Sequence, residues 1–241
     1  MTANKQEITV MTRRYFYLIL TIGILAFSQP GLCREAAAPA TSTTKPVMLS
    51  VDEILKHLEK HYASTGFSAN FFQTSRVKAM DMTETASGAM VVKRPGMMRW
   101  TYEQPDRHLI ITDGRQLWIY HPSDNQVTVG KAPPFFGDGK GASFLSNIQL
   151  VRKQFDVSQE KMTVNQEYVL KLVPRDKSYD LSYVLIVISS DTFDIVDVKT
   201  FNSYGDETHI ELSNIRMEQN IDDAQFKFVI PPGTEVVRMD G

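Results

Sequence analysis

Apolar and polar residues alternate along most of the chain between residues 67 and 217, and this alternation constrains the fold more than any other feature. Successive side chains of a β-strand point to opposite faces, so a period of two predicts strands that are buried on one side. Tight-turn sequences separate the segments, as at Pro95-Gly96, Asp113-Gly114 and 204–206. The predicted strands are 67–77, 84–93, 97–103, 107–112, 116–121, 125–130, 153–158, 167–173, 181–189, 194–201 and 207–217. With about 11 strands and almost no helix between them, the pattern predicts a mainly β protein, in which one antiparallel sheet rolls into a barrel or half-barrel.

Two of these strands are apolar on both faces. One contains Leu-Trp-Ile-Tyr at 117–120, and the other contains Leu-Ser-Tyr-Val-Leu-Ile-Val-Ile at 181–188. In a simple barrel, the outer side of each strand would carry polar residues. We therefore expect an apolar cover on each side of both strands, such as a helix on one side and a core or cavity on the other.

A helix is predicted before the first strand. Ser50 and Glu53 have the spacing of a capping box, in which the two side chains bond the first free amides of a helix. Apolar residues then recur at helical spacing. They are Val51, Ile54, Leu55, Leu58 and Tyr62. The segment is expected to be a short amphipathic helix with one apolar stripe.

The segment 131–150 interrupts the strand pattern. Prolines and glycines fill its first half, and a short helical stretch follows from about Ala142 to Leu150. Phe144, Leu145 and Ile148 share one side of that stretch. Ordered insertions of this length are often functional, and we expect this one to form a lid.

The N-terminal segment has the pattern of a secretory signal. Arg13-Arg14 precede an uninterrupted apolar run over 15–27, which is shorter than a membrane span requires. We expect residues 1–38 to be a signal peptide and translation to begin at Met11. A retained anchor helix and a twin-arginine signal are the alternatives.

The rest of the chain is expected to comprise a flexible Ala/Pro/Thr linker at 39–49 and one folded domain at 50–241. The chain's single cysteine, Cys33, is either removed with the signal or lipidated at the mature N-terminus, although Pro30-Gly31-Leu32 matches a lipidation motif poorly. An exported chain without disulfides fits the bacterial periplasm.

Composition excludes several classes of function. The formal charge of −2 provides no basic surface for a phosphate backbone, so we expect no nucleic-acid partner. A single cysteine permits neither an internal disulfide nor a multi-cysteine zinc site. The glycines at 137–141 lack the spacing of a phosphate-binding loop and are interpreted as a hinge.

Catalytic and metal-binding motifs are not evident. The sequence contains no Gly-x-Ser-x-Gly and no His-Glu-x-x-His. His57 and His61 lie one helical turn apart, but no third ligand for a metal is evident from sequence. His108, His121 and His209 have no nearby cysteine or paired acidic residue. We therefore expect neither an enzyme nor a metal site, and no cofactor.

Five methionines fall within a short stretch beside an aromatic hairpin that contains Trp100 and Tyr102. They are Met80, Met82, Met90, Met97 and Met98. Methionine fills irregular gaps in cores and is common where a surface accepts irregular apolar ligands. The cluster is therefore open to two interpretations, ordinary core packing or a cavity that accepts lipid.

Arg94 is unusual because it follows an apolar strand and immediately precedes Pro95. Its parity matches Met90 and Val92, which places it at the mouth of a cavity if the even side is interior. Its five donors suit several carbonyls at once, and backbone carbonyls of the lid could accept them. The alternative is a surface arginine on a hairpin.

Several fragments, taken together, resemble the LolA family of periplasmic lipoprotein carriers. Their order and spacing match over about residues 50–238. The fragments are Phe71-Phe72-Gln73, Gly88 through Gly96, Arg99-Trp100-Thr101-Tyr102, Gln104-Pro105, Asp113-Gly114, 117–122, Gln126-Val127, 223–228 and Pro231-Pro232-Gly233.

The resemblance implies an unclosed barrel with a helical lid over an apolar cavity, and a monomeric protein without catalysis or cofactor. The family takes triacylated lipoproteins from an inner-membrane ABC transporter to the outer-membrane acceptor LolB. Arg94 matches the family arginine that holds the lid shut. Met98 and Trp100 match aromatic positions at the cavity mouth, although Met98 departs from the usual aromatic. The lid itself matches the family pattern poorly.

Combining this resemblance with the strand pattern, we expect ten residues to line the cavity: Met90, Val92, Met98, Trp100, Leu109, Ile111, Leu117, Ile119, Phe144 and Leu145. A LolB-like acceptor and a lipid-sensing periplasmic regulator remain alternatives on the same fold, and lipidation of Cys33 would identify the acceptor. A periplasmic esterase is a further alternative.

Overall fold

The structure is a computed structural model that describes residues 49–63, 66–132, 145, 148–176 and 180–239. The predicted signal peptide, nearly all of the predicted linker, Cys33 and Phe144 lie outside the described residues. Among the helices of the described residues, none has the length and apolar character needed to cross a membrane.

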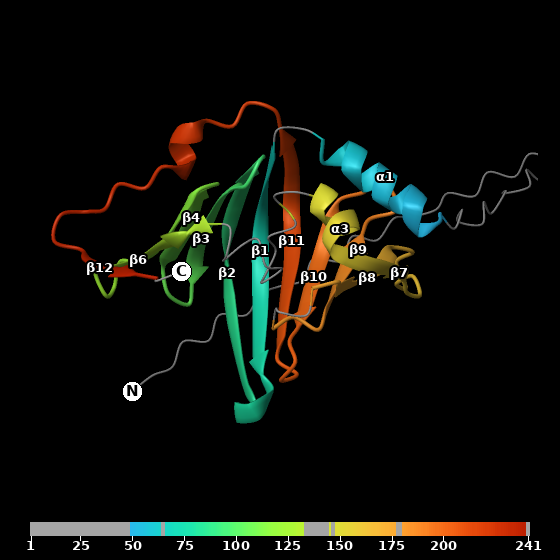
Figure 1. Ribbon diagram of the computed structural model, residues 1–241, viewed down its shortest axis with the longest axis horizontal. Coiled ribbons are helices and arrows are strands. Elements are labelled where there is room, and N and C mark those ends of the chain that lie inside the picture. The colour runs from blue at the N-terminus through green and yellow to red at the C-terminus, as the bar shows by residue number, and fades with distance from the viewer. Residues whose placement is uncertain (1–48, 64–65, 133–144, 146–147, 177–179, 240–241) are drawn as a thin grey trace, which may run out of the picture. The chain divides into compact units, whose positions relative to one another are not determined.

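A single twelve-stranded sheet forms the folded part of the chain, in the order β12-β6-β5-β4-β3-β2-β1-β11-β10-β9-β8-β7 (Figure 1). The strands are β1 Gly66–Val77, β2 Met82–Lys93, β3 Met97–Gln104, β4 His108–Asp113, β5 Gln116–His121, β6 Gln126–Lys131, β7 Phe155–Gln159, β8 Tyr168–Pro174, β9 Tyr183–Ile188, β10 Ile195–Phe201, β11 Glu207–Glu218 and β12 Glu235–Arg238. β12 and β7 are the two edges, so the sheet is unclosed. The predicted fold class is confirmed.

The twelfth strand, β12, escaped the sequence analysis. It pairs with β6, and this pair is parallel, whereas every other pair of neighbouring strands among the described residues is antiparallel. Its four residues are all exposed. A strand so short, with no buried side, has no alternation of apolar and polar residues for a pattern to detect.

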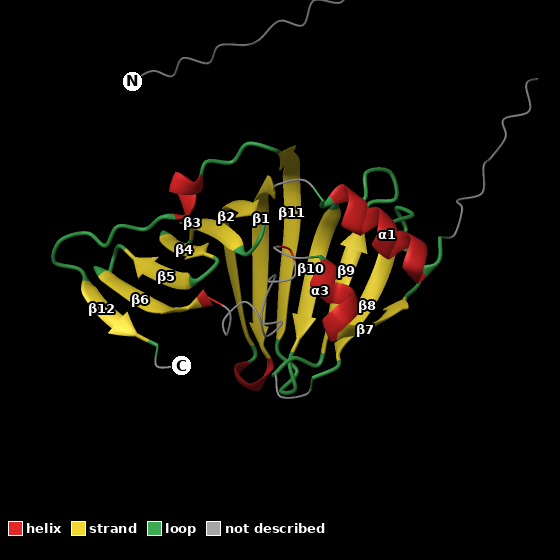
Figure 2. Cartoon of the chain, turned by 45° about the horizontal axis from the view of Figure 1, so that its top comes forward, coloured by secondary structure: helices red, strands yellow, loops and turns green. Residues whose placement is uncertain are grey.

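The helices α1 (Val51–His61) and α3 (Gln149–Gln154) lie beside each other over β7–β10, on the side that we call the inner face (Figure 2). The capping box of α1 is confirmed, since Ser50 N donates to Glu53 Oε2 at 2.8 Å and Glu53 N donates to Ser50 Oγ at 3.4 Å. α3 continues to Gln154, past the predicted end at Leu150. The strand expected at 153–158 therefore begins at Phe155.

The inner core fills the space between α1, α3 and the sheet. Its members are buried apolar residues, of which the largest include Ile54, Leu58, Phe67, Met90, Met98, Leu145, Leu170, Leu172 and Ile186. Burying each such side chain contributes roughly 1.5–3 kcal/mol. The inner core is therefore the main apolar contact between the helices and the strands.

A second, outer core lies on the opposite face of β4–β6. It consists of Ile111, Trp118, Val127 and Val129, with Leu109, Tyr120 and Phe228 packed against it. Phe228 belongs to the segment after β11, which includes a 3-10 helix at Asp223–Phe226 and leads to β12 (Figure 1). The outer side of strand 117–120 therefore has the predicted apolar cover, and Leu117 on its other side is fully buried.

β9 differs from this prediction, because no buried apolar cluster of the described residues lies on its outer side. Its inner residues Val184, Ile186 and Ile188 are buried, but Tyr183 on the outer side is only half-buried. Tyr183 stacks on Phe201 with ring centroids 4.4 Å apart, and Lys171 Nζ lies 4.6 Å from its ring centre. Neighbouring side chains on the same face replace the separate cover that the apolar sequence suggested.

Candidate functional site

The guanidinium of Arg94 lies where the end of β2 meets the end of α1. Its central carbon is 5.1 Å from the ring centre of Tyr62 and 6.0 Å from that of Phe67. Arg94 Nη2 donates a hydrogen bond to the backbone oxygen of Leu145 at 3.2 Å. A bond from Arg94 to a backbone carbonyl of the segment 131–150 is thus present, and Arg94 is not a free surface arginine.

Burial determines the electrostatics around Arg94. Desolvation lowers the pKa of Arg94, and the neighbouring Tyr62 opposes this shift. Tyr62 is itself buried, its hydroxyl accepts from Ile195 N at 2.8 Å, and burial raises the pKa of Tyr62. The aromatic faces and the Leu145 carbonyl offset part of the cost of burying a charge. The position of the Arg94 side chain therefore depends on these aromatic rings and on the Leu145 carbonyl.

We call Leu145 and residues 148–154 the lid; the segment 131–150, which was predicted to form a lid, ends within α3, and its residues 133–144, 146 and 147 lie outside the described residues. Leu145, Ile148 and Val151 are buried members of the inner core. Arg152 lies on the other side of α3 and joins it to α1.

Three hydrogen bonds from the Arg152 guanidinium reach α1. Nε donates to Glu59 Oε1 at 2.5 Å, while Nη1 and Nη2 donate to Asp52 Oδ1 at 2.8 Å and to the Asp52 carbonyl at 3.1 Å. Arg152 was not among the residues predicted from the sequence. Asp52 and Glu59 are seven residues apart on one helix face, so a basic side chain is expected between them. Their spacing does not identify which basic side chain it is.

The far end of α1 is attached to the turn between β9 and β10. His61 Nε2 lies 2.7 Å from Asp194 Oδ1, and His57 stacks on Phe193 with ring centroids 4.4 Å apart. Each histidine thus has its own partner in this turn.

Five of the ten predicted lining residues meet in the inner core, namely Met90, Val92, Met98, Trp100 and Leu145. Trp100 and Tyr102 each pack edge-on against Phe71, with ring centroids 4.8 Å apart in both pairs. These rings form an aromatic wall beside the methionines.

Leu109 and Ile111 lie instead in the outer core, so their expected place with Met90 is wrong. Trp100 pairs with Ile110 across β3 and β4, and directly paired residues share a face. Ile110 is the inner residue that the analysis missed, and it packs against the inner core. Leu117 and Ile119 share the inner face, because Ile110 pairs with Ile119 across β4 and β5.

The five methionines do not form one cluster. Met90 and Met98 are buried in the inner core, whereas Met80 and Met82 lie around the β1–β2 turn with 66% and 40% of their surface exposed. The five side chains therefore do not lie together, and of the five only Met90 and Met98 are members of the inner core.

Toward the other end of the strands the inner face becomes polar and open. A cavity of about 790 Å³ lies there, and Tyr102 joins it to the inner core. Tyr102, His108 and His121 stack along it, with successive ring centroids 3.9 and 4.9 Å apart. Burial raises the pKa of Tyr102 to about 12. Burial also lowers the pKa of His108, and the nearby His121 lowers it further.

The prediction that His209 lacks an acidic partner is wrong. Asp197 and Glu211 both contact it on the outer face of β10 and β11. Glu211 was within reach of sequence reasoning, because residues two apart on a strand share a face. Asp197 was not, because strand register cannot be obtained from sequence alone.

Most of the unclosed sheet falls within a known protein family. The model of a family described as outer membrane lipoprotein carrier protein LolA matches residues 63–229. The chain belongs to the LolA family. The LolA match includes β1–β11, Arg94 and the whole described lid.

Individual relatives agree with the family assignment, and a solved structure agrees with the fold. An outer-membrane lipoprotein carrier protein of Nitrosomonas europaea is 29% identical over 228 residues, which cover 95% of this chain and all of the relative. Its counterpart in Nitrosospira multiformis is 31% identical over 169 residues, covering 70% of this chain and 80% of the relative. The crystal structure of an uncharacterized conserved protein from Thermus thermophilus has a TM-score of 0.51 at 17% identity, covering 78% and 98% of the two chains, and supports the fold.

Proposed function

We propose that this protein is a periplasmic carrier that encloses the acyl chains of triacylated lipoproteins against the inner face of its sheet. It receives them from an inner-membrane lipoprotein-releasing ABC transporter and delivers them to LolB or an equivalent outer-membrane acceptor. Family membership and the carrier names of its relatives support this role. The protein acts as a monomer and needs no catalytic group or cofactor for it.

The energetics of lipid exposure require such an enclosure. Each methylene removed from water contributes about 0.8 kcal/mol, so a 16-carbon chain represents roughly 12 kcal/mol of exposure. Three chains therefore leave a membrane extremely slowly without shelter. A carrier that binds the acyl chains too tightly cannot release them. We therefore infer that its own side chains fill the apolar site when the cargo leaves.

The observation that carries the proposal is the composition of the lid. Leu145, Ile148 and Val151 complete the inner core, and acyl chains can take the place of such side chains because apolar contact is non-directional. Polar bonds of Arg94 and Arg152 attach the same segment to its surroundings. We infer that cargo displaces the lid from the inner core, while Arg94 favours its return.

The role of individual lining residues follows from this arrangement. Met90, Val92, Met98, Trp100 and Leu145 are proposed to contact acyl chains, together with Leu117 and Ile119 farther along the inner face. Leu109 and Ile111 have no such role, because the outer core encloses them. Arg94 is proposed as the residue that holds the lid closed.

The test uses spheroplasts that make a radiolabelled triacylated lipoprotein and the matching ABC transporter. We expect the purified protein to release label into the supernatant as a one-to-one complex. An equal amount of serum albumin should release far less, and a lipoprotein whose acylated cysteine is replaced by alanine should not form the complex. Failure of the folded protein to release label would contradict the carrier role and favour an acceptor or a lipid sensor.

A further inference from the structure

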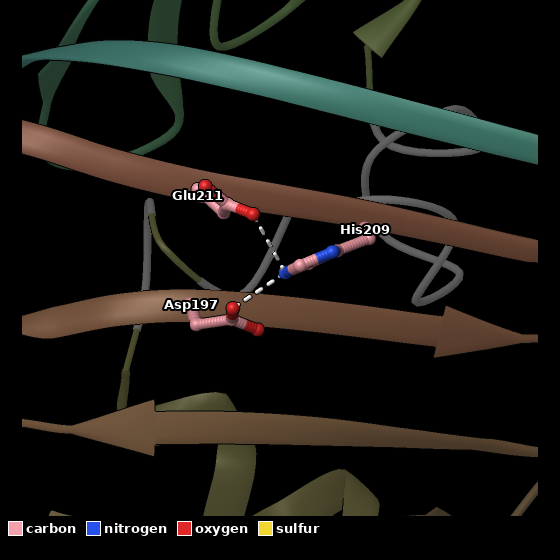
Figure 3. Close-up of side chains that lie close together, drawn as sticks. All are labelled: Asp197, His209 and Glu211. Atoms are coloured by element: carbon pink, nitrogen blue, oxygen red, sulfur yellow. Dashed lines mark hydrogen bonds and ion pairs between the residues drawn. The ribbon is translucent and has the colours of Figure 1, made fainter. Parts of the chain in front are cut away.

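A compact group of three potential metal ligands lies on the outer face of β10 and β11 (Figure 3). His209 Nε2 is 2.5 Å from Asp197 Oδ2 and 3.7 Å from Glu211 Oε1. Ligand atoms of the three side chains all lie within 4.8 Å of one another. The group lies on the opposite side of the sheet from the inner core, so the proposed carrier role does not use it.

Strand geometry explains why these side chains meet. His209 and Glu211 are two residues apart on β11 and therefore project from the same face. Asp197 pairs directly with Glu211 across β10 and β11. Their neighbours Val198 and Ile210 are buried in the inner core, which keeps both strands in this orientation. The three ligands thus come from a rigid part of the sheet rather than from a loop.

The two carboxylates offer more acceptor capacity than His209 can use. Asp197 Oδ1 is buried, yet it makes no hydrogen bond within the part of the chain that the structure describes. A buried carboxylate oxygen without a partner is costly. One proton donor on His209 Nε2 faces both acids, whereas a cation between them would interact with every one of these oxygens.

We propose that Asp197, His209 and Glu211 bind a divalent cation of the zinc class. One imidazole with two carboxylates is a donor set that suits zinc, and three protein ligands leave a fourth position for water. Tetrahedral bonds of about 2.1 Å place ligand atoms about 3.4 Å apart, close to the present His209–Glu211 separation. The His209–Asp197 contact opens by about 1 Å when the metal replaces the proton between them.

Charge and access are consistent with this site. Two carboxylates and a neutral imidazole carry two negative charges, which match the charge of the cation. Glu211 has 56% of its side chain exposed, so a cation can enter from solvent. Lys199 lies opposite His209 in the strand register and adds a positive charge nearby. Replacing Lys199 by Gln should therefore strengthen binding.

The experiment titrates untagged, chelator-treated protein with Zn²⁺ by calorimetry and with Co²⁺ by visible absorption. We expect one bound ion per chain and the intense visible bands of tetrahedral Co²⁺. His209→Gln and Asp197→Asn should each weaken binding at least tenfold, and Glu211→Gln should weaken it severalfold. In the unaltered protein, Zn²⁺ should shift the ¹⁵N resonance of His209 Nε2, which tests the site without any variant.

His61→Gln is the matched control. Its imidazole also lies 2.7 Å from an aspartate, Asp194, but it belongs to no three-ligand group among the described residues. This variant should bind Zn²⁺ as the unaltered protein does. Absence of binding, binding that survives His209→Gln, or an unchanged His209 resonance would each overturn the proposal.

Discussion

The two faces of the sheet are covered in similar ways by different segments. On the inner face, Arg94 donates to the backbone oxygen of Leu145 in the lid at 3.2 Å. On the outer face, Arg99 donates to the backbone oxygen of Gln225 at the same distance. Each arginine thus attaches the segment that covers its own side, yet the two segments differ in what else holds them.

The outer segment is the stretch after β11 that contains the 3-10 helix Asp223–Phe226 and β12, and backbone pairing attaches it to the sheet. β12 forms a parallel ladder with β6, and Glu235 N and Met239 N donate to the carbonyls of Asn125 and Val129, both at 2.9 Å. The described part of the lid, in contrast, has no strand of its own and depends on side-chain contacts of Arg94, Arg152 and its apolar residues. A cover without a ladder can leave and return, whereas a cover within the sheet cannot leave without breaking the ladder.

The largest effect should come from removing the anchor of the outer segment. Phe226 is fully buried, so Phe226→Ala leaves a cavity and should lower the free energy of unfolding by about 3–5 kcal/mol. Urea denaturation measures the change. The control is Phe72→Ala, which removes a phenylalanine with 45% of its surface exposed and should cost less than about 1 kcal/mol. Similar losses in both variants would show that the outer segment is not a fixed part of the fold.

The second effect separates the two arginines. Arg94→Leu removes a charge-assisted hydrogen bond of about 1.5–3 kcal/mol and should increase the open fraction of the lid about tenfold. The open lid should keep acyl chains bound, because leucine adds apolar surface at the mouth. We therefore expect this variant to accept lipoprotein from spheroplasts but to transfer it to the acceptor at least several times more slowly.

Arg99→Leu is the matched control for this comparison. It removes a bond of the same length from the outer side, where the ladder of β12 remains. Transfer by this variant should equal that of the unaltered protein. Normal transfer by Arg94→Leu, or an equal defect in Arg99→Leu, would refute the distinction between a movable and a fixed cover.

The strands of the sheet could be predicted because apolar and polar residues alternate along a strand that is buried on one face. All eleven predicted strands exist, and the capping box of α1 has the expected bonds. The prediction of which β4 residues face inward was wrong, because this depends on how β4 is aligned with β3. Met97 pairs with Asp113, so even residues of β3 face the same side as even residues of β4, and Ile110 rather than Ile111 points inward. A shift of one residue reverses every side chain of a strand.

The sequence could not provide contacts that depend on packing between distant elements. The sequence of β2 showed that Arg94 shares a face with Met90 and Val92. It did not show that Arg94 bonds Leu145, which lies 51 residues away. Arg152 meets α1 only because α3 lies beside that helix, and Asp197 meets His209 only through the register of β10 and β11. Patterns within one element thus predicted the fold, whereas the site required the tertiary structure.

The third effect concerns the attachment of α3 to α1. Arg152→Ala removes the bonds to Asp52 and Glu59, which should open the lid roughly threefold more often, as expected for a partly exposed ion pair. Hydrogen exchange of the amides at 149–154 measures this opening. High salt should reduce the difference, because it screens the ion pairs in the unaltered protein. Lys56→Ala, which loses a pair with the same Asp52 inside α1, should leave the exchange of α3 unchanged.

The smallest effect concerns the open end of the inner face, where Tyr102, His108 and His121 line the cavity. The pKa of His108 is lowered by burial and by His121, so the folded protein binds fewer protons there than the unfolded chain does. The contribution of His108 to stability is therefore complete above pH 6.5, the ordinary value, and is lost as the pH falls below it. His108→Gln should therefore flatten the pH dependence of the free energy of unfolding just below pH 6.5. An unchanged slope in His108→Gln would mean that this end of the face is as open to water in the folded protein as in the unfolded chain.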